Sequence, residues 1–209
     1  GPAPAGGVHP AGDCRHFDCV DEAISVSASN SHAVSLGELV LRAAIDKAGQ
    51  QKQLAERAFA QVSDADLHRV LDAETNSIAI IMQHIAGNLI SRWTDFLTTD
   101  GEKPDRNRDG EFVDAQMSRV ALVAFWERGW GVMLATLRSL TPDDLTRTIQ
   151  IRGQLLSVIA AIVRSIEHNG YHVGQIVMLA RHWAGPGWKT LTIARGGSRE
   201  YDDRVRSGG

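Results

Sequence analysis

Four long stretches of the chain repeat apolar residues at the three- and four-residue spacing that places them on one side of a helix. They cover residues 35–62, 76–93, 114–139 and 157–183. The second stretch is apolar nearly all round at its start, which is typical of a helix surrounded by other helices. The pattern therefore predicts an all-α fold, an antiparallel four-helix bundle.

Two connections between these stretches have patterns of their own. Residues 147–156 alternate apolar and polar positions around Arg152-Gly153, which predicts a small β-hairpin before the fourth helix. Residues 98–114 form a polar loop that carries many charges. We expect these charges to be solvated or locally paired, and the alternative, that the loop covers a functional site, stays open.

The two ends of the chain lack helical periodicity. Residues 1–33 are rich in Gly, Pro, Ser, Ala and Asp, so we expect a flexible N-terminal segment there. Residues 34–201 are predicted to form the helical domain, and residues 202–209 a C-terminal tail. The only two cysteines, Cys14 and Cys19, lie in the first segment and make no disulfide framework.

The N-terminal segment carries no other clear signal. His9 and His16 lie near its cysteines, as in a zinc cluster, but the spacing matches no closed structural site. The first residues also lack the charged start and the apolar run of a signal peptide. We therefore expect a cytoplasmic location.

Length and charge narrow the classes of function. A chain of 209 residues with 43% hydrophobic residues can form one domain with a proper core. Its 22 basic and 25 acidic residues give a net charge of −3, and they form no block of Lys and Arg. The longest uncharged apolar runs, residues 77–82 and 155–163, are too short to cross a bilayer. We expect neither a nucleic acid nor a membrane as a partner.

Candidate chemistry begins with a histidine pair in the fourth stretch. His168 and His172 are four residues apart, so their imidazoles leave one face of a helix a turn apart and can hold one divalent cation. Gln175 shares that face one turn beyond His172. The alternative is two ordinary half-buried histidines, because such a pair supplies only two ligands.

A third ligand must come from elsewhere in the chain. His84 is the best candidate, because it is the only other histidine in a strongly buried stretch, and Asn88 follows one turn later on the same side. A lone histidine in such a helix is ordinarily a core residue with satisfied hydrogen bonds. Ligation by nitrogen alone would suit zinc, nickel, iron or copper and disfavour calcium and magnesium.

Aromatic residues supply candidates for a substrate site. Trp126 and Trp130 form an i, i+4 pair in the third stretch, which belongs either to the core or to a pocket wall. The candidate lining residues are Asn88, Trp93, Trp126, Trp130, Tyr171 and Gln175. Of these, the polar residues are expected to line the site and orient its ligands, not to bind a metal themselves.

Several local sequences extend these signals. They include Asn-Ser-Ile-Ala-Ile-Ile-Met-Gln-His at 76–84 and Tyr-His-Val-Gly-Gln-Ile at 171–176, with further agreement over 91–104 and 187–196. Together they resemble the DinB/YfiT-like four-helix-bundle superfamily, and in particular a branch of it carried as a domain of unknown function. The resemblance covers about residues 38–201.

The resemblance implies that His84, His168 and His172 bind one divalent metal ion. Nickel or zinc is the favoured metal, with iron or manganese as alternatives. Relatives in the superfamily include metal-dependent thiol transferases and mycothiol-dependent isomerases, and many are dimers. A small-molecule substrate, a low-molecular-weight thiol and a homodimer are therefore implied for this chain.

Three functions stay open at this point. The first is a metal-dependent transferase that ionises a small thiol and delivers it to an electrophile. The second is a metal-assisted hydrolase, which lacks an obvious general base: there is no HExxH motif, and Glu167 points about 100° away from His168. The third is a non-catalytic metal-binding stress or interaction protein, in which the metal is only structural.

Overall fold

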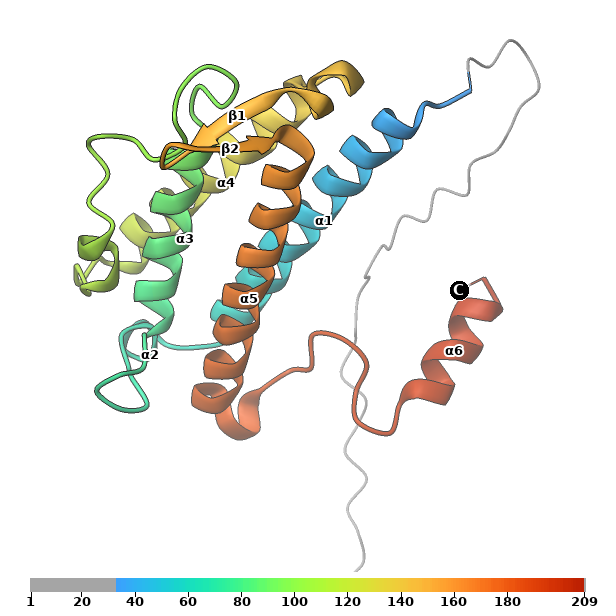
Figure 1. The fold of residues 1–209 in the computed structure, drawn as a ribbon. Helices are drawn as coiled ribbons and strands as arrows, with labels where there is room; N and C mark the ends of the chain where they lie inside the picture. Colours follow the sequence, from blue (N-terminus) through green and yellow to red (C-terminus); the bar gives the residue numbers. More distant parts are fainter. Residues whose placement is uncertain (1–32, 209) are drawn as a thin grey trace, which may run out of the picture. The chain divides into compact units, whose positions relative to one another are not determined.

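The computed structural model of the chain describes residues 33–208, and from Val34 onward these residues form one unit (Figure 1). Four long helices dominate it: α1 (Leu36–Phe59), α3 (Ile78–Trp93), α4 (Arg119–Ser139) and α5 (Val158–Ala184). They confirm the predicted four-helix bundle. The predictions for the N-terminal segment, including its cysteines and histidines, lie outside the described residues.

A serine precedes each of the four long helices. The hydroxyl groups of Ser35, Ser77, Ser118 and Ser157 each accept a hydrogen bond from the backbone N–H three residues later. This bond satisfies one of the backbone donors that a helix start leaves open. The serines therefore fix where the helices begin more sharply than the apolar pattern does.

The third predicted helix begins later than its apolar pattern suggested, at Arg119 instead of residue 114. The five residues before it are not helical. Gln116 has a positive φ of 50°, and the Asp114 carboxylate lies 2.8 Å from Nδ1 of His68. A tertiary contact and a left-handed residue thus override the local pattern.

Short elements join the long helices. They are α2 (Asp64–Leu67), the 3₁₀ turns η1 (Asp109–Phe112), η2 (Pro142–Thr146) and η3 (Gly185–Gly187), and α6 (Ser198–Arg206). The predicted domain end at residue 201 falls inside α6. This helix has no buried residue, so no apolar stripe marks it in the sequence.

The main helix contacts follow the ring α1–α4–α3–α5. Neighbours α1 and α4 run in opposite directions, as do α3 and α5, whereas α3 and α4 run the same way (Figure 1). Thr136 near the end of α4 accordingly donates a 3.0 Å hydrogen bond to the carbonyl of Trp93, the last residue of α3. The expected antiparallel arrangement therefore does not hold for α3 and α4, because the long connection over residues 94–118 allows a parallel return.

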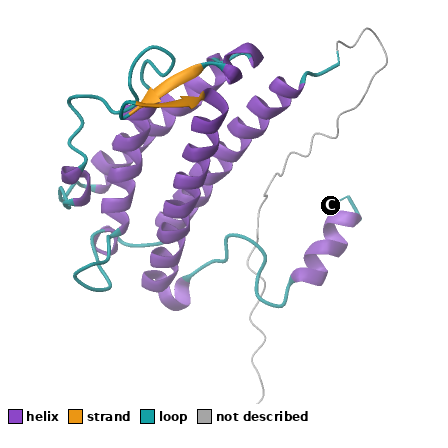
Figure 2. Cartoon of the chain, in the orientation of Figure 1, coloured by secondary structure: helices purple, strands orange, loops and turns teal. Residues whose placement is uncertain are grey.

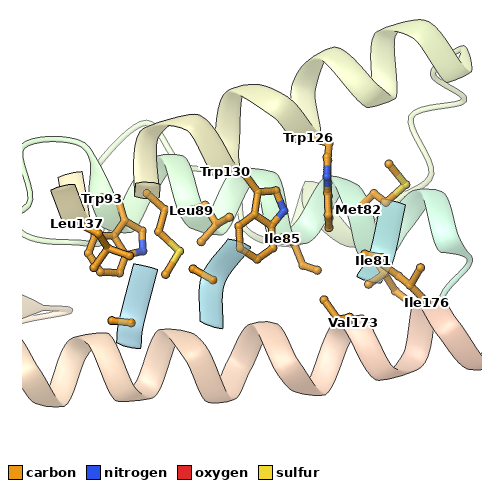
Figure 3. Close-up of a cluster of buried hydrophobic side chains, with 14 of the residues drawn as sticks. Ile81, Met82, Ile85, Leu89, Trp93, Trp126, Trp130, Leu137, Val173 and Ile176 are labelled. Atoms are coloured by element: carbon orange, nitrogen blue, oxygen red, sulfur yellow. The ribbon is translucent and has the colours of Figure 1, made fainter. Parts of the chain in front are cut away.

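The core lies between the four helices. Trp93, Trp126 and Trp130 are all but completely buried, and Figure 3 shows them among apolar side chains from α3, α4 and α5. The rings of Trp126 and Trp130 are 5.4 Å apart. Among the described residues, one helix, α4, is long enough and apolar enough to cross a membrane. Its tryptophans, however, pack inside this bundle.

The predicted hairpin is confirmed as β1 (Thr148–Ile151) and β2 (Gln154–Ser157), which pair antiparallel (Figure 2). Arg152 and Gly153 form its turn with φ angles of 54° and 74°, the left-handed values that a tight hairpin turn requires. The Asp100 carboxylate accepts hydrogen bonds of 2.8 Å from both of their backbone N–H groups. This contact joins the long connection to the hairpin tip.

The close approach of α4 to α3 is testable at Gly129. A Cβ there would lie 2.7 Å from the Ala86 Cα, so Gly129→Ala should lower the free energy of unfolding by about 1–3 kcal/mol. Gly131, on the same helix, has no atom within 4 Å of such a Cβ. Gly131→Ala should raise stability by about 0.5–1 kcal/mol, because alanine favours the helix.

Urea unfolding of both variants provides the measurement. Effects of the same sign in the two variants would contradict the close approach of the helices.

Candidate metal centre

The antiparallel packing of α3 on α5 brings three histidines together. The Nε2 atoms of His84 and His168 are 3.1 Å apart. One ring nitrogen from each of His84, His168 and His172 lies within 4.8 Å of the others. His168 and His172 share a face of α5 one turn apart, as their spacing predicted, and His84 faces them from α3. These residues can hold a metal ion.

A carboxylate contacts His84 on the ring nitrogen that points away from the other two histidines. Its Nδ1 lies 2.9 Å from Oε2 of Glu111 in η1. Because an ionised carboxylate only accepts hydrogen bonds, Nδ1 carries the proton and the lone pair of Nε2 faces the other histidines. Such carboxylate–imidazole pairs orient metal-binding histidines.

Glu111 remains ionised although it is buried. Burial raises the pKa of its carboxyl group, but hydrogen bonds from His84 and Arg106 outweigh this and lower the pKa overall. Arg106 donates from Nε and Nη2 to the two carboxylate oxygens, each at 2.7 Å. Gly87 leaves the necessary room, since a Cβ there would lie 2.5 Å from Oε1 of Glu111.

The expectation that the charges of residues 98–114 are solvated or locally paired holds for Glu111, because Arg106 of the same loop pairs with it. Glu111 is nevertheless only 8% exposed and also contacts His84 of α3. The loop lies over the histidines, which was the alternative left open. One sequence signal could have shown it: Gly87 weakens a buried helix one turn after His84, and such a glycine often marks a close approach. The partner in that approach could not be read from the sequence.

Gln175 contacts Nδ1 of His172 in the same way that Glu111 contacts Nδ1 of His84. Its side-chain Oε1 lies 2.9 Å from Nδ1 of His172, so Nδ1 donates and Nε2 is free as a ligand. The two residues are one turn apart on α5, as the spacing indicated. Gln175 therefore orients a histidine and does not reach the cavity itself.

Burial keeps the α5 histidines neutral. Desolvation, followed by the proximity of His172 and His84, lowers the pKa of His168 to about 4. The pKa of His172 is also lowered by burial. Neutral imidazoles are the form that binds metals. Nδ1 of His168 is buried and has no hydrogen-bond partner among the described residues.

A cavity of about 350 Å³ opens beside the three histidines. Of the predicted lining residues, Asn88, Trp93 and Tyr171 border it. The ring of Phe112 covers His84 with its centroid 4.4 Å away. Phe112 was missed because it lies in the polar loop over residues 98–114, where no apolar periodicity points to a site.

Trp126 and Trp130 do not line the cavity, which corrects the prediction for these two residues. Both are 0% exposed and belong to the core. The indole N–H of Trp126 donates to Glu56 of α1, so this ring points toward α1 and not into the cavity. Periodicity placed the pair on a buried face, but it could not separate the core from a pocket wall.

The donor set fits a divalent transition metal. Two nitrogens that share one cation at about 2.0–2.1 Å in tetrahedral geometry lie about 3.3 Å apart, close to the 3.1 Å between the Nε2 atoms of His84 and His168. Two facing lone pairs at this distance repel each other unless a proton or a cation lies between them. Three protein ligands also leave a coordination position open, as in catalytic sites.

Comparison with known proteins identifies a family and a similar fold. A family model described as a protein of unknown function (DUF1572) matches residues 35–197. A solved structure also matches, with a TM-score of 0.58 and 17% sequence identity over 77% of this chain and 94% of the other. That protein is YfiT from Bacillus subtilis, described as a probable metal-dependent hydrolase with an unusual four-helix bundle topology. No curated protein matches the chain.

The low pKa of His168 predicts how the metal-free protein responds to acid. An unfolded histidine takes up its proton near pH 6.5, whereas folded His168 does so only near pH 4. As pH falls through this window the unfolded state binds more protons, so stability is lost, by about 2–3 kcal/mol at pH 4. Above pH 6.5 the group has no effect.

Urea unfolding at a series of pH values measures this loss. His168→Leu should show a flatter dependence between pH 6.5 and 4 than the wild type, and His182→Leu, a change at an exposed position, should keep the wild-type slope. Equal slopes in all three proteins would contradict the low pKa.

Proposed function

This chain belongs to the DUF1572 family, and on that premise we propose that it is a divalent-metal-binding transferase that activates a low-molecular-weight thiol. The metal would be held by His84, His168 and His172. The observation that carries the proposal is the pair of facing Nε2 atoms at the buried end of a cavity. By resemblance to the superfamily, nickel or zinc is the proposed metal, with iron or manganese as alternatives.

The residues around the histidines would keep the centre ordered. Glu111 and Gln175 fix the proton on Nδ1 of His84 and His172, so both Nε2 atoms stay available. Phe112 covers His84 and excludes water from it. A divalent cation held there would act as a Lewis acid and lower the pKa of a thiol or a water molecule that reaches it.

The composition of the cavity favours a thiol over water as the nucleophile. No carboxylate among the described residues lines it, and both oxygens of nearby Glu111 are engaged by Arg106. A general base for water is therefore lacking. A thiol needs none, because its pKa of about 8.5 is close to neutrality.

The proposed reaction is a nucleophilic substitution by the thiol sulfur. The thiol loses its proton to solvent, its sulfur forms a bond to an electrophilic carbon, and the leaving group departs with the electron pair of the broken bond. Trp93 and Tyr171 border the cavity and offer aromatic surface to the electrophile.

A metal-assisted hydrolase is the second candidate. It is favoured by the likeness in fold to YfiT, which carries that description. A non-catalytic metal-binding protein is the third. The homodimer, the cytoplasmic location and the absence of nucleic-acid and membrane partners stay predictions.

Metal titration of the protein stripped of metal tests the binding site. His84→Ala, His168→Ala and His172→Ala should each weaken binding of zinc or nickel by more than about 100-fold, since each removes a ligand. Glu111→Gln should weaken it about 10–100-fold, because it disturbs the orientation of His84. Calorimetry gives these affinities without any assay of activity.

His182→Ala is the matched control, because His182 is exposed on the same helix as His168 and His172 and, among the described residues, makes no hydrogen bond and one ring contact, with Trp183. It should bind metal like the wild type. Equal affinity in all variants would overturn the proposed centre.

An assay with two substrates separates the three functions. The metal-loaded protein, given a small thiol and chlorodinitrobenzene, should form the thioether, and His172→Ala should lose this activity. Hydrolysis of nitrophenyl acetate without any thiol, in the absence of thioether formation, would favour the hydrolase. Metal binding with neither activity would support the non-catalytic protein.

A further inference from the structure

The cavity beside the histidines carries an excess of positive charge. Arg92, Arg108, Arg152 and Arg164 line it, and no carboxylate among the described residues does so. The whole chain has a net charge of −3, so this cluster of positively charged side chains is a local feature. A concave surface lined by one sign of charge attracts ligands of the opposite sign.

Arg92 holds an unused hydrogen-bond donor. This residue is only 9% exposed, and its Nη2 donates to Oε2 of Glu102 at 2.8 Å. Its Nη1 is buried and has no hydrogen-bond partner among the described residues. A buried guanidinium N–H without an acceptor is costly, and Arg92 lines the cavity, so a ligand acceptor that reaches this N–H would remove that cost.

The single negative charge of Glu102 does not neutralise the arginines that it binds. The same carboxylate accepts hydrogen bonds from Nη2 of Arg92 and, at 2.8 Å, from Nε of Arg152. It also accepts from Nη1 of Arg106 at 3.3 Å. Glu102 thus serves three guanidinium groups, and the nearby Asp100 carboxylate binds the backbone N–H groups of Arg152 and Gly153 and not their side chains. The shared carboxylate positions Arg92 and Arg152 without cancelling them.

Two further arginines have their guanidinium groups free of ion pairs. Arg164, on α5, makes no hydrogen bond or ion pair in the part of the chain that the structure describes. Within residues 33–208, Arg108 makes no side-chain hydrogen bond or ion pair, and its Cζ lies 5.4 Å from the centroid of the Phe112 ring. Both remain able to bind a ligand.

The positive groups gather at one end of the cavity. Arg92 follows His84 by eight residues on α3, and Arg164 precedes His172 by eight residues on α5. Because α3 and α5 are antiparallel, both arginines are displaced toward the hairpin, by about 12 Å of helix. Arg152 in the hairpin turn lines the same cavity. Arg108, next to Phe112, lies nearer the histidines.

We infer that the substrate of this centre carries an anionic group, a carboxylate or a phosphate, which binds Arg92, Arg152 and Arg164 at the hairpin end of the cavity. The reacting part of the molecule then faces the histidines. Guanidinium groups bind both kinds of oxyanion through charge-assisted hydrogen bonds. The inference rests on the proposed function for its catalytic meaning, but anion binding can be measured without metal.

The test uses the full chain freed of metal and then of chelator. Calorimetry follows the binding of glutarate, of glycerol phosphate and of the neutral glutaramide. At least one of the two anions should bind at one site, and the one that binds identifies the oxyanion, whereas glutaramide should not bind. Arg164→Gln should weaken that binding about tenfold or more, because it removes a charge-assisted hydrogen bond.

Arg138→Gln is the matched control, because Arg138 is exposed on α4 and does not line the cavity. Arg92→Gln should also weaken binding, provided that its circular dichroism spectrum matches that of the wild type; the exposed Arg164 decides the matter if it does not. Equal losses in Arg164→Gln and Arg138→Gln would leave only general charge attraction and overturn the inference. So would binding of glutaramide as tight as that of the anions, or no anion binding at all.

These outcomes are independent of the metal titration. Anion binding that persists in His172→Ala while metal binding is lost would support both proposals. A protein that binds metal at the histidines but no anion would overturn this inference alone.

Discussion

The organisation of the site depends on the buried contact between the Glu111 carboxylate and the imidazole of His84. A buried carboxylate is stable only when it is paired and hydrogen-bonded, and here Arg106 and His84 supply those partners. The absence of a side chain at Gly87 makes the approach sterically feasible. This contact holds the connection over residues 94–118 against α3, and with it the ring that covers His84.

The same connection determines the topology of the bundle. Its length lets α4 return parallel to α3, which leaves α3 and α5 as antiparallel neighbours. In that arrangement His84 lies opposite His168 and His172, and Arg92 lies toward the same end as Arg164. One pair of helices thus carries both a nitrogen-lined centre and a cationic end of the same cavity.

Core and cavity divide the tryptophans between them. Trp126 and Trp130 are enclosed by apolar side chains (Figure 3), whereas Trp93 borders the cavity and donates its indole N–H to Ser165 of α5. His168 and His172 line this cavity, and their burial lowers their pKa values. Packing of the bundle therefore prepares the protonation state that a metal requires. The 17% identity with YfiT carries the likeness of fold and no more.

The sequence by itself determined the four helices, the hairpin and the shared helix face of His168 and His172, whereas His84 was only the best remaining candidate until the resemblance completed the set. Helix periodicity, serine caps and i, i+4 spacing depend on residues close together in the chain, so local patterns report them. The tertiary structure alone decided that Glu111 supports His84, that Trp126 and Trp130 lie in the core, and that four arginines meet at one cavity. These contacts join segments far apart in the chain. Which charged side chains are paired and which stay free is decided only when the helices pack.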